Sequence, residues 1–144
     1  MIPDGNIYLI PLGTYRRTID AESRIIVPGI WREEPLFKND SGYLSFRRPC
    51  RLVLLPQDFV NKILKGKRKG IGVREKEDIR ILLAALHTVM LDRRGRMTVP
   101  EVLAGILGIG PGDVMTLTAT GGWVEIWPAD EWERSRGEKG LFTP

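Results

Sequence analysis

The sequence has 144 residues, of which 42% are hydrophobic and 28% are charged, a balance typical of a globular domain rather than a disordered chain. The longest apolar run without a charged residue, Ile81–Leu91, is too short for the roughly 20 residues that span a bilayer, and the first residues lack the basic start of a secretory signal. One cysteine and one histidine exclude a disulfide framework, most zinc sites and the usual histidine-dependent triads, so we expect no metal or cofactor.

Charge is unevenly distributed along the chain. Residues 1–100 carry 19 Lys and Arg against 11 Asp and Glu, a net of +8, whereas residues 101–144 carry 3 against 7, a net of −4. A basic surface followed by an acidic segment indicates a polyanion partner, although solvated charged faces on an ordinary protein would give the same pattern.

The first part of the chain predicts short strands followed by short helices. Pro11 and Gly13 are turn residues, β-branched residues favour strands, and proline suits the first turn of a helix. In chain order we expect strands at Tyr8–Ile10, Tyr15–Asp20 and Arg24–Val27, a short helix from Pro28 that Pro35 ends, strands from about Tyr43 to Leu55, and a helix at Pro56–Leu64.

The middle of the chain predicts a basic loop and a helix. The run from Lys65 to Gly70 carries four basic residues, and a solvated loop is a simpler interpretation than a phosphate contact. Apolar residues at helical spacing predict an amphipathic helix from Arg74 to Leu86, with His87 at its end as a cap.

The last part repeats the order of the first. We expect strands at Thr88–Asp92 and Arg96–Val99, a helix from Pro100 to about Gly108, strands at Val114–Thr120 and Trp123–Trp127 around Gly121-Gly122, and a helix from Pro128 to about Arg136. Core or interface packing explains the tryptophans near these elements better than base stacking does.

An internal repeat explains this order. Asp20–Pro28 aligns with Asp92–Pro100 at an offset of 72 residues, and Leu52–Asp58 aligns with Val124–Asp130 at the same offset without a gap. We therefore predict a tandem duplication with repeats at 1–64 and 88–136, a connection at 65–87 and a short tail at 137–144. Each repeat is too small to bury its apolar strands alone, so the two must share one core.

These residues resemble the MraZ family of the AbrB/SpoVT swapped-hairpin group. The resemblance rests on the paired D-x-x-x-R-(x)₃-P blocks, the opening Leu12–Tyr15 and the Pro-x-Asp segments before the last helix of each repeat, and it covers roughly residues 8–136. It implies a mainly β fold with short helices, in which two tandem repeats form one intertwined, pseudo-dimeric β-barrel. It also implies a bacterial transcriptional regulator whose chains assemble into rings.

The resemblance implies which side chains contact DNA. The contacting arginine ends the family's D-x-x-G-R signature, which corresponds to Arg24 and Arg96 here. A guanidinium can bind phosphate or a guanine edge in pairs, and a two-stranded ribbon can approach the major groove. From spacing alone, each arginine could instead pair with Asp20 or Asp92 and only stabilise the turn, and we interpret these two aspartates as structural.

The two blocks differ in charge. Glu22 and Ser23 replace the lysine and glycine of the common D-S-K-G-R form, whereas Arg93 and Arg94 strengthen the second block ahead of Gly95, which can adopt a positive φ. Two further arginines could compensate for Glu22, namely Arg16 and Arg17 on the strand that leads into the first block.

The hypothesis is a non-enzymatic, sequence-specific regulator that binds double-stranded DNA at repeated short sites upstream of a cell-division and cell-wall operon. It would act in the cytoplasm at the nucleoid, as a ring-shaped homo-oligomer, without membrane or small-molecule substrate. One alternative is an antitoxin-like protein-binding module, and another is a ring-forming structural protein with weak non-specific DNA binding. The sequence has no recognisable acid–base pair or phosphate loop that would indicate an enzyme.

Overall fold

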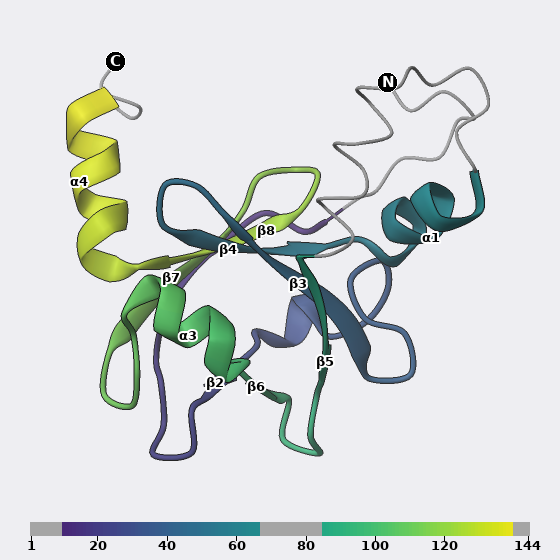
Figure 1. The fold of residues 1–144 in the computed structure, drawn as a ribbon, viewed down its shortest axis with the longest axis horizontal. Helices are drawn as coiled ribbons and strands as arrows, with labels where there is room; N and C mark the ends of the chain where they lie inside the picture. Colours follow the sequence, from purple (N-terminus) through teal and green to yellow (C-terminus); the bar gives the residue numbers. More distant parts are fainter. Residues whose placement is uncertain (1–9, 67–84, 140–144) are drawn as a thin grey trace.

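The computed structural model describes residues 10–66 and 85–139 (Figure 1), which form eight strands, three α-helices and one 3₁₀ turn. The strands are β1 (Thr14–Thr18), β2 (Arg24–Ile26), β3 (Ser41–Arg47), β4 (Arg51–Leu55), β5 (Leu86–Met90), β6 (Arg96–Thr98), β7 (Val114–Ala119) and β8 (Val124–Pro128). The helices are η1 (Gly29–Trp31), α1 (Gln57–Gly66), α3 (Glu101–Leu107) and α4 (Ala129–Lys139). A mainly β fold with short helices is therefore confirmed, and no helix in the described ranges is long and apolar enough to cross a membrane.

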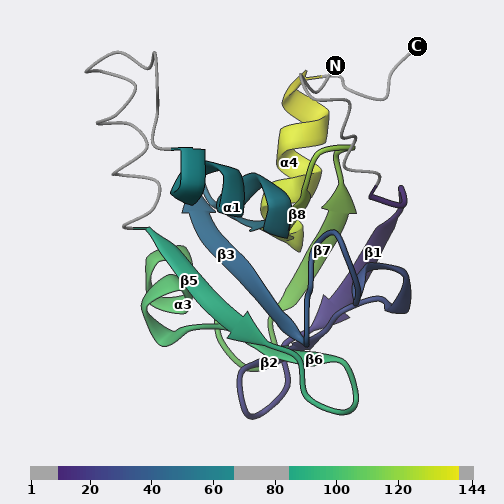
Figure 2. The same cartoon turned by 90° about the vertical axis from the view of Figure 1, so that its right-hand side faces the viewer.

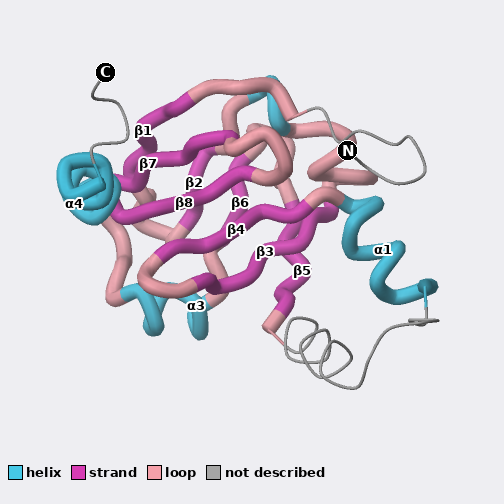
Figure 3. Tube along the Cα trace, turned by 90° about the horizontal axis from the view of Figure 1, so that it is seen from above, coloured by secondary structure: helices cyan, strands magenta, loops and turns pink. Residues whose placement is uncertain are grey.

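The strands form two antiparallel sheets. The larger has the order β1-β7-β8-β4-β3-β5, and the smaller pairs β2 with β6. Figure 3 shows the large sheet with β1 and β5 at its two edges, and α1 and α4 at opposite ends of the molecule. Each edge strand pairs with a hairpin of the other repeat, β1 with β7 and β5 with β3, so neither repeat completes its own part of the sheet. Within the described residues the ladders make two sheets, and no ladder that closes the expected single barrel is detected there.

An approximate two-fold axis relates the repeats. Ile25 pairs with Met97 at the centre of the small sheet, and Val53 pairs with Glu125 at the centre of the large one. Both pairs join positions 72 residues apart, the offset of the sequence repeat. The axis therefore passes through the middle of both sheets.

The offset of 72 holds in both aligned blocks but not for one pair of strands that lies between them. Thr18 pairs with Val114 and Met90 pairs with Ser41. Thr18 and Met90 lie 72 residues apart, but Ser41 and Val114 lie 73 apart. Three residues, 48–50, lie between the paired Arg47 and Arg51. Only Gly121 and Gly122 lie between Thr120 and Trp123, whose backbones are hydrogen-bonded to each other. The β3–β4 turn is thus one residue longer, and the offset returns to 72 at β4 and β8.

One hydrophobic core joins the repeats. Ile25 and Met97 are fully buried at its centre, and Trp31 packs edge-on against Tyr15 with ring centroids 5.2 Å apart. Buried residues come from both repeats, among them Leu44, Leu52, Leu54, Leu103, Met115, Leu117 and Ile126. A smaller cluster of Val53, Leu55 and Val60 lies beside α1. The prediction that the halves share a core is confirmed, as is packing of Trp31 and Trp127, which are both buried.

Two secondary-structure predictions are wrong in the described ranges. Leu86 begins β5 rather than ending a helix, and His87 pairs with Leu44 in the sheet rather than capping that helix. Pairing with β3 overrides the helical spacing there, because the following Thr88 and Val89 are β-branched and favour an extended chain. The helix from Pro28 is only the single turn η1. Tyr8 and Leu9, the loop residues 67–70, and the connecting helix before residue 85 lie outside the described residues.

Candidate nucleic-acid interface

Two pseudo-equivalent loops project from the same end of the molecule. We call residues 19–23, between β1 and β2, loop 1, and residues 91–95, between β5 and β6, loop 2. Figures 1 and 2 show both loops at the bottom of the molecule, and Figure 2 places them opposite α1 and α4. The structure therefore brings the two predicted signature blocks to one surface.

An aspartate builds each loop. In loop 2, Oδ1 of Asp92 accepts hydrogen bonds from the backbone N–H groups of Arg94 and Arg96, both at 2.9 Å. In loop 1, Oδ1 of Asp20 accepts them from Glu22 at 2.9 Å and Arg24 at 2.8 Å. These contacts agree with the interpretation of the two aspartates as structural, because each carboxylate holds backbone amides of its own turn.

The same hydrogen bonds lower the pKa of both carboxyl groups. The Arg96 backbone N–H is the main cause for Asp92, whose pKa falls to about 2 against the opposing effect of desolvation, with the Arg96 side chain and the Arg94 N–H adding to it. Desolvation acts to raise the pKa of Asp20, but hydrogen bonds from Arg24 and Glu22 leave it below its ordinary value. Both loops therefore favour a charged aspartate.

The fourth position of each loop has a left-handed backbone. Gly95 has a φ of 75° and Ser23 has a φ of 63°. The expected positive φ at Gly95 is confirmed, and Ser23 adopts the same left-handed backbone without the conformational freedom of glycine. The Gly95 carbonyl accepts from the Val27 N–H at 2.9 Å, and the Ser23 carbonyl accepts from the Val99 N–H at 2.8 Å. Each loop is thus held by the opposite repeat.

The guanidinium of Arg24 is fully engaged with carboxylates. Its Nε contacts Asp20 at 2.9 Å, Nη2 contacts Glu22 at 2.5 Å, and Nη1 lies 3.9 Å from Asp92 of loop 2. The hydrogen bond that Arg24 Nε donates to Asp20 is the main reason that the pKa of the Arg24 guanidinium is raised above its ordinary value. This is the turn-stabilising arrangement that the spacing alone left open.

The arginines of loop 2 are much less engaged. Arg96 contacts Asp92 through Nε at 2.7 Å, but its two terminal nitrogens have no partner in the described part of the chain. Arg93 and Arg94 are exposed, and their side chains have no hydrogen bond or ion pair among the described residues. Loop 2 and the adjoining Arg96 of β6 therefore present three guanidinium groups with donors available to an anion.

The structure does not bring Arg16 and Arg17 to the loops in the way expected. Arg16 lines a shallow hollow with Cys50, Asp113 and Glu131 on the side of the molecule near α4. Arg17 donates through Nε to the Ile26 carbonyl at 3.2 Å, and its guanidinium lies 5.3 Å from the Tyr15 ring centroid. The two side chains therefore lie in different surroundings, and compensation of Glu22 by either of them stays a prediction.

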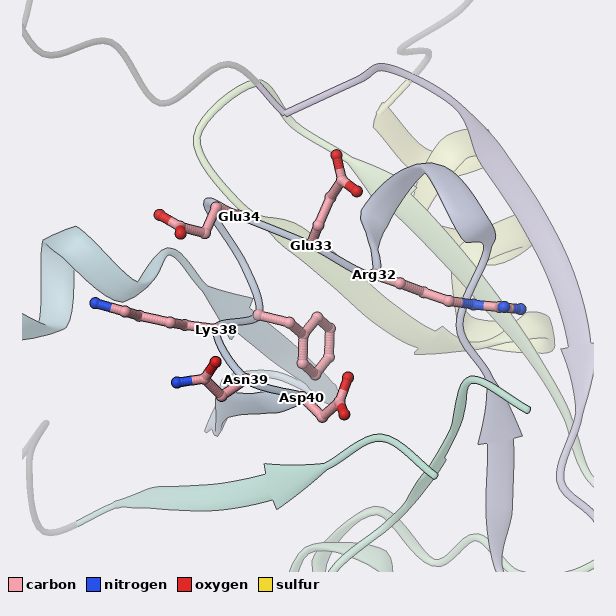
Figure 4. Close-up of a pocket in the computed structure, with 7 residues that line it drawn as sticks. Arg32, Glu33, Glu34, Lys38, Asn39 and Asp40 are labelled. Carbon is pink, nitrogen blue, oxygen red and sulfur yellow. The ribbon is translucent and has the colours of Figure 1, made fainter. Parts of the chain in front are cut away.

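Sequence reasoning missed Arg32. Its Nε donates to the Val27 carbonyl at 2.6 Å, and its guanidinium lies against Gly95, where an added Cβ would come within 2.2 Å of Nε. Figure 4 shows a hollow that Arg32 lines together with Glu33, Glu34, Phe37, Lys38, Asn39 and Asp40, and the Arg32 side chain extends away from Glu34 and Lys38. Nothing in the spacing of the repeat points to this contact, because it joins η1 to the loop of the other repeat.

No group of three or more His, Cys, Asp or Glu side chains in the described ranges has a geometry that could hold a metal ion. Cys50 is half-buried in the turn between β3 and β4, and desolvation, aided by Glu131, raises its pKa. Residues of this kind fit packing positions rather than a reactive centre.

Comparison with known proteins identifies the class and then the family. No model of a known protein family matches the chain. Curated proteins do match it along most of its length, and they are named as transcriptional regulators rather than as enzymes. The transcriptional regulator MraZ of Bifidobacterium longum is 31% identical over 131 residues, covering 89% of this chain and 83% of the relative. The transcriptional regulators MraZ of Christiangramia forsetii and Leifsonia xyli are each 30% identical, covering 86% and 85% of this chain and 81% and 83% of the relatives. The chain belongs to the MraZ family.

Proposed function

We propose that this protein is a sequence-specific transcriptional regulator that binds duplex DNA with the end of the molecule formed by loops 1 and 2. The projecting guanidinium groups of loop 2 carry this proposal. Arginine binds phosphate or the O6 and N7 atoms of guanine through paired donors, and the terminal nitrogens of Arg93, Arg94 and Arg96 have no partner among the described residues. The targets would be repeated short sites upstream of a cell-division and cell-wall operon, reached by a cytoplasmic, nucleoid-associated protein.

The two loops should contribute unequally. Loop 1 with Arg24 has two acidic and one basic side chain, whereas loop 2 with Arg96 has one acidic and three basic side chains. Because a phosphate must compete with three carboxylates for Arg24 but with one for Arg96, loop 2 should supply most of the binding. Loop 1 would then mainly position the surface.

The test is fluorescence anisotropy on a labelled duplex from upstream of the protein's own gene, with a scrambled duplex, across a salt series. Tight binding to the first duplex with a steep salt dependence is expected, because each phosphate contact releases counterions. Equal and weak binding to both duplexes would instead favour a structural ring former, and salt-insensitive or absent binding would favour a protein-binding module.

Variants assign the contacts. Arg94→Gln removes a side chain without an internal partner, so it should weaken binding without changing the unfolding temperature. Arg96→Ala should weaken binding more than Arg24→Ala does. Arg47→Gln is the matched control, because Arg47 is exposed and distant from the loops. Ser41, at the start of β3, pairs with Met90 next to loop 2, and Arg47 lies six residues further along the strand, about 20 Å away. If the Arg94→Gln and Arg96→Ala variants bind the duplex like the wild type, the assignment of the DNA-binding site to loop 2 is wrong.

We also infer that the strand exchange between repeats reflects a swapped-hairpin barrel, and that chains assemble into a ring. Pairing of β1 with β7 and of β5 with β3 supports the first statement. A ring would raise avidity by presenting several weak sites at high effective concentration. Light scattering should give a mass of several chains. A monomer at micromolar concentration would contradict the ring while leaving the DNA-binding surface intact.

A further inference from the structure

We propose that Arg32 is a further DNA-contact residue, supplied by the first repeat to the surface of loop 2. This inference rests on the proposed function, because it names an additional member of the same binding surface. The contact with loop 2 is direct. The Arg32 guanidinium lies so close to Gly95 that an added Cβ would be 2.2 Å from Nε and 2.6 Å from Nη1.

The position of this guanidinium is fixed while its outer donors are free. The hydrogen bond from Nε to the Val27 carbonyl, at 2.6 Å, anchors the inner edge. Val27 itself donates to Gly95, so Arg32, Val27 and Gly95 form one connected unit. Nη1 and Nη2 have no hydrogen-bond or ion-pair partner among residues 10–66 and 85–139. A half-buried guanidinium of this kind is preorganised to bind an acceptor that comes from outside.

The surrounding charge indicates an anion. Arg32 lies beside a loop that already carries Arg93, Arg94 and the partly engaged Arg96. Asp92 compensates one of these charges through Arg96, and the remaining like charges repel one another, since the neighbouring Glu33 and Glu34 make no ion pair with Arg32 in the described structure. The phosphate groups of a duplex would relieve this repulsion, and contacts of this type position a protein on DNA.

A purely structural role would be expected in both repeats. At the offset of 72, Trp31 corresponds to Leu103 and both are buried, so Arg32 corresponds to Ala104. Loop 1 has Ser23 in place of Gly95, and it forms the same hydrogen-bonded turn without an arginine from α3. The turn therefore does not need this guanidinium in order to fold, which argues for a role toward a ligand.

The experiment compares salt slopes on the full chain. Arg32→Gln and Arg32→Met should each bind both the upstream and the scrambled duplex roughly three- to tenfold more weakly at moderate salt, with a slope of log affinity against log salt lower by about one. Arg32→Met keeps an unbranched side chain of similar length beside Gly95 in case the glutamine variant folds poorly. Arg47→Gln should leave the slope unchanged. Thermal unfolding of each variant separates lost binding from lost fold.

Protection from chemical modification tests the same contact without a substitution. Phenylglyoxal labelling, followed by peptide mass mapping, should show that DNA slows the modification of Arg32 together with Arg93 and Arg94, but not of Arg47. A folded Arg32 variant with the wild-type salt slope, or labelling of Arg32 that DNA does not change, would overturn the inference. If the wild type itself shows no salt-dependent binding, the proposed function fails instead.

Discussion

Asp92 and Asp20 define the geometry of the candidate interface more directly than the arginines do. Each carboxylate uses one oxygen to accept two backbone N–H groups and the other to hold the Nε of its arginine. The aspartate therefore shapes the turn and orients the guanidinium at the same time. A carboxylate in this position is compatible with DNA binding because its charge is neutralised from within the loop.

The charge of Asp92 should make stability depend on acid pH. The pKa of Asp92 in the folded protein is about 2, below the ordinary value of 3.8, so its stabilising contribution is complete above pH 4 and is lost as the pH falls toward 2. Asp92→Asn retains an amide oxygen for the backbone N–H groups but loses this charge. The variant should be less stable than the wild type at pH 7, and the difference should shrink between pH 4 and pH 2. Urea unfolding at a series of pH values measures it, and a difference independent of pH would contradict the assignment.

Gly95 is constrained by its backbone and by a neighbour. Gly95→Ala introduces a side chain at a φ of 75° and displaces Arg32 from the Val27 carbonyl. Gly108→Ala is the matched control, because Gly108 has a φ of 69° and open space around its Cα. Both should destabilise the protein by about 1 kcal/mol through the backbone, and Gly95→Ala by about 1 kcal/mol more for the lost hydrogen bond. Equal urea midpoints for the two variants would show that the Arg32 contact contributes nothing to stability.

The short strands are held by pairing with the opposite repeat. β2 and β6 have only three residues each, yet their central residues Ile25 and Met97 are fully buried. Neither strand would be stable alone, so the small sheet depends on both repeats being folded.

Two methionines test this dependence. Met97→Ala should destabilise the protein by about 2–5 kcal/mol, since it leaves a cavity at the centre of the small sheet. Met90→Ala, on a side chain that is 56% exposed, should change the free energy of unfolding by less than about 0.5 kcal/mol. Chemical denaturation measures the free energy of unfolding of both variants. Similar decreases for the two would contradict the position of Met97 at the centre of the core.

Much of the fold could be predicted from the sequence, and particular elements show why the rest could not. The two turn blocks and the prolines before α3 and α4 are local signals, so the strands and helices around them were located to within a few residues. The sequence pattern does not reveal that β1 pairs across to β7, because pairing is set by contacts between distant segments. The prediction that Leu86 ends a helix was wrong for this reason. Likewise, the Asp–Arg spacing predicted the turn partners, but the Arg32–Gly95 contact depends on how the repeats pack.

The molecule as a whole is a pseudo-dimer. Its two loops lie on the same surface but differ in charge. In loop 1 the loop's own carboxylates bind the donors of Arg24, whereas the terminal nitrogens of Arg96 beside loop 2 can still bind an anion. If this end of the molecule binds DNA as proposed, the two loops should contact the duplex unequally even though the backbone is nearly symmetric. Arg93 and Arg94 account for part of the difference, and Glu22 accounts for another part, because its side chain is 71% exposed and binds Nη2 of Arg24.

Glu22→Gln should therefore increase DNA affinity by releasing Arg24. A double-mutant cycle on the upstream duplex isolates the effect. Glu22→Gln should strengthen binding several-fold in the wild type and much less in the Arg24→Ala background. Asp58→Asn, which removes an exposed negative charge in α1 at the other end of the molecule, is the control for net charge. An equal gain in both backgrounds would mean that Glu22 acts only through long-range repulsion.

The unlike pair Val53 and Glu125 at the centre of the large sheet has a consequence for the covalent link between the repeats. If the chain were cut into separate halves, two copies of the second half could pair through β8 only by placing two Glu125 carboxylates side by side, which is unfavourable for like charges on adjacent strands. Two copies of the first half would pair Val53 with Val53 at this position. Such a dimer would carry loop 1 twice, with the Arg24 donors bound by carboxylates in both copies. The separated halves should therefore pair with each other in preference to pairing with their own kind.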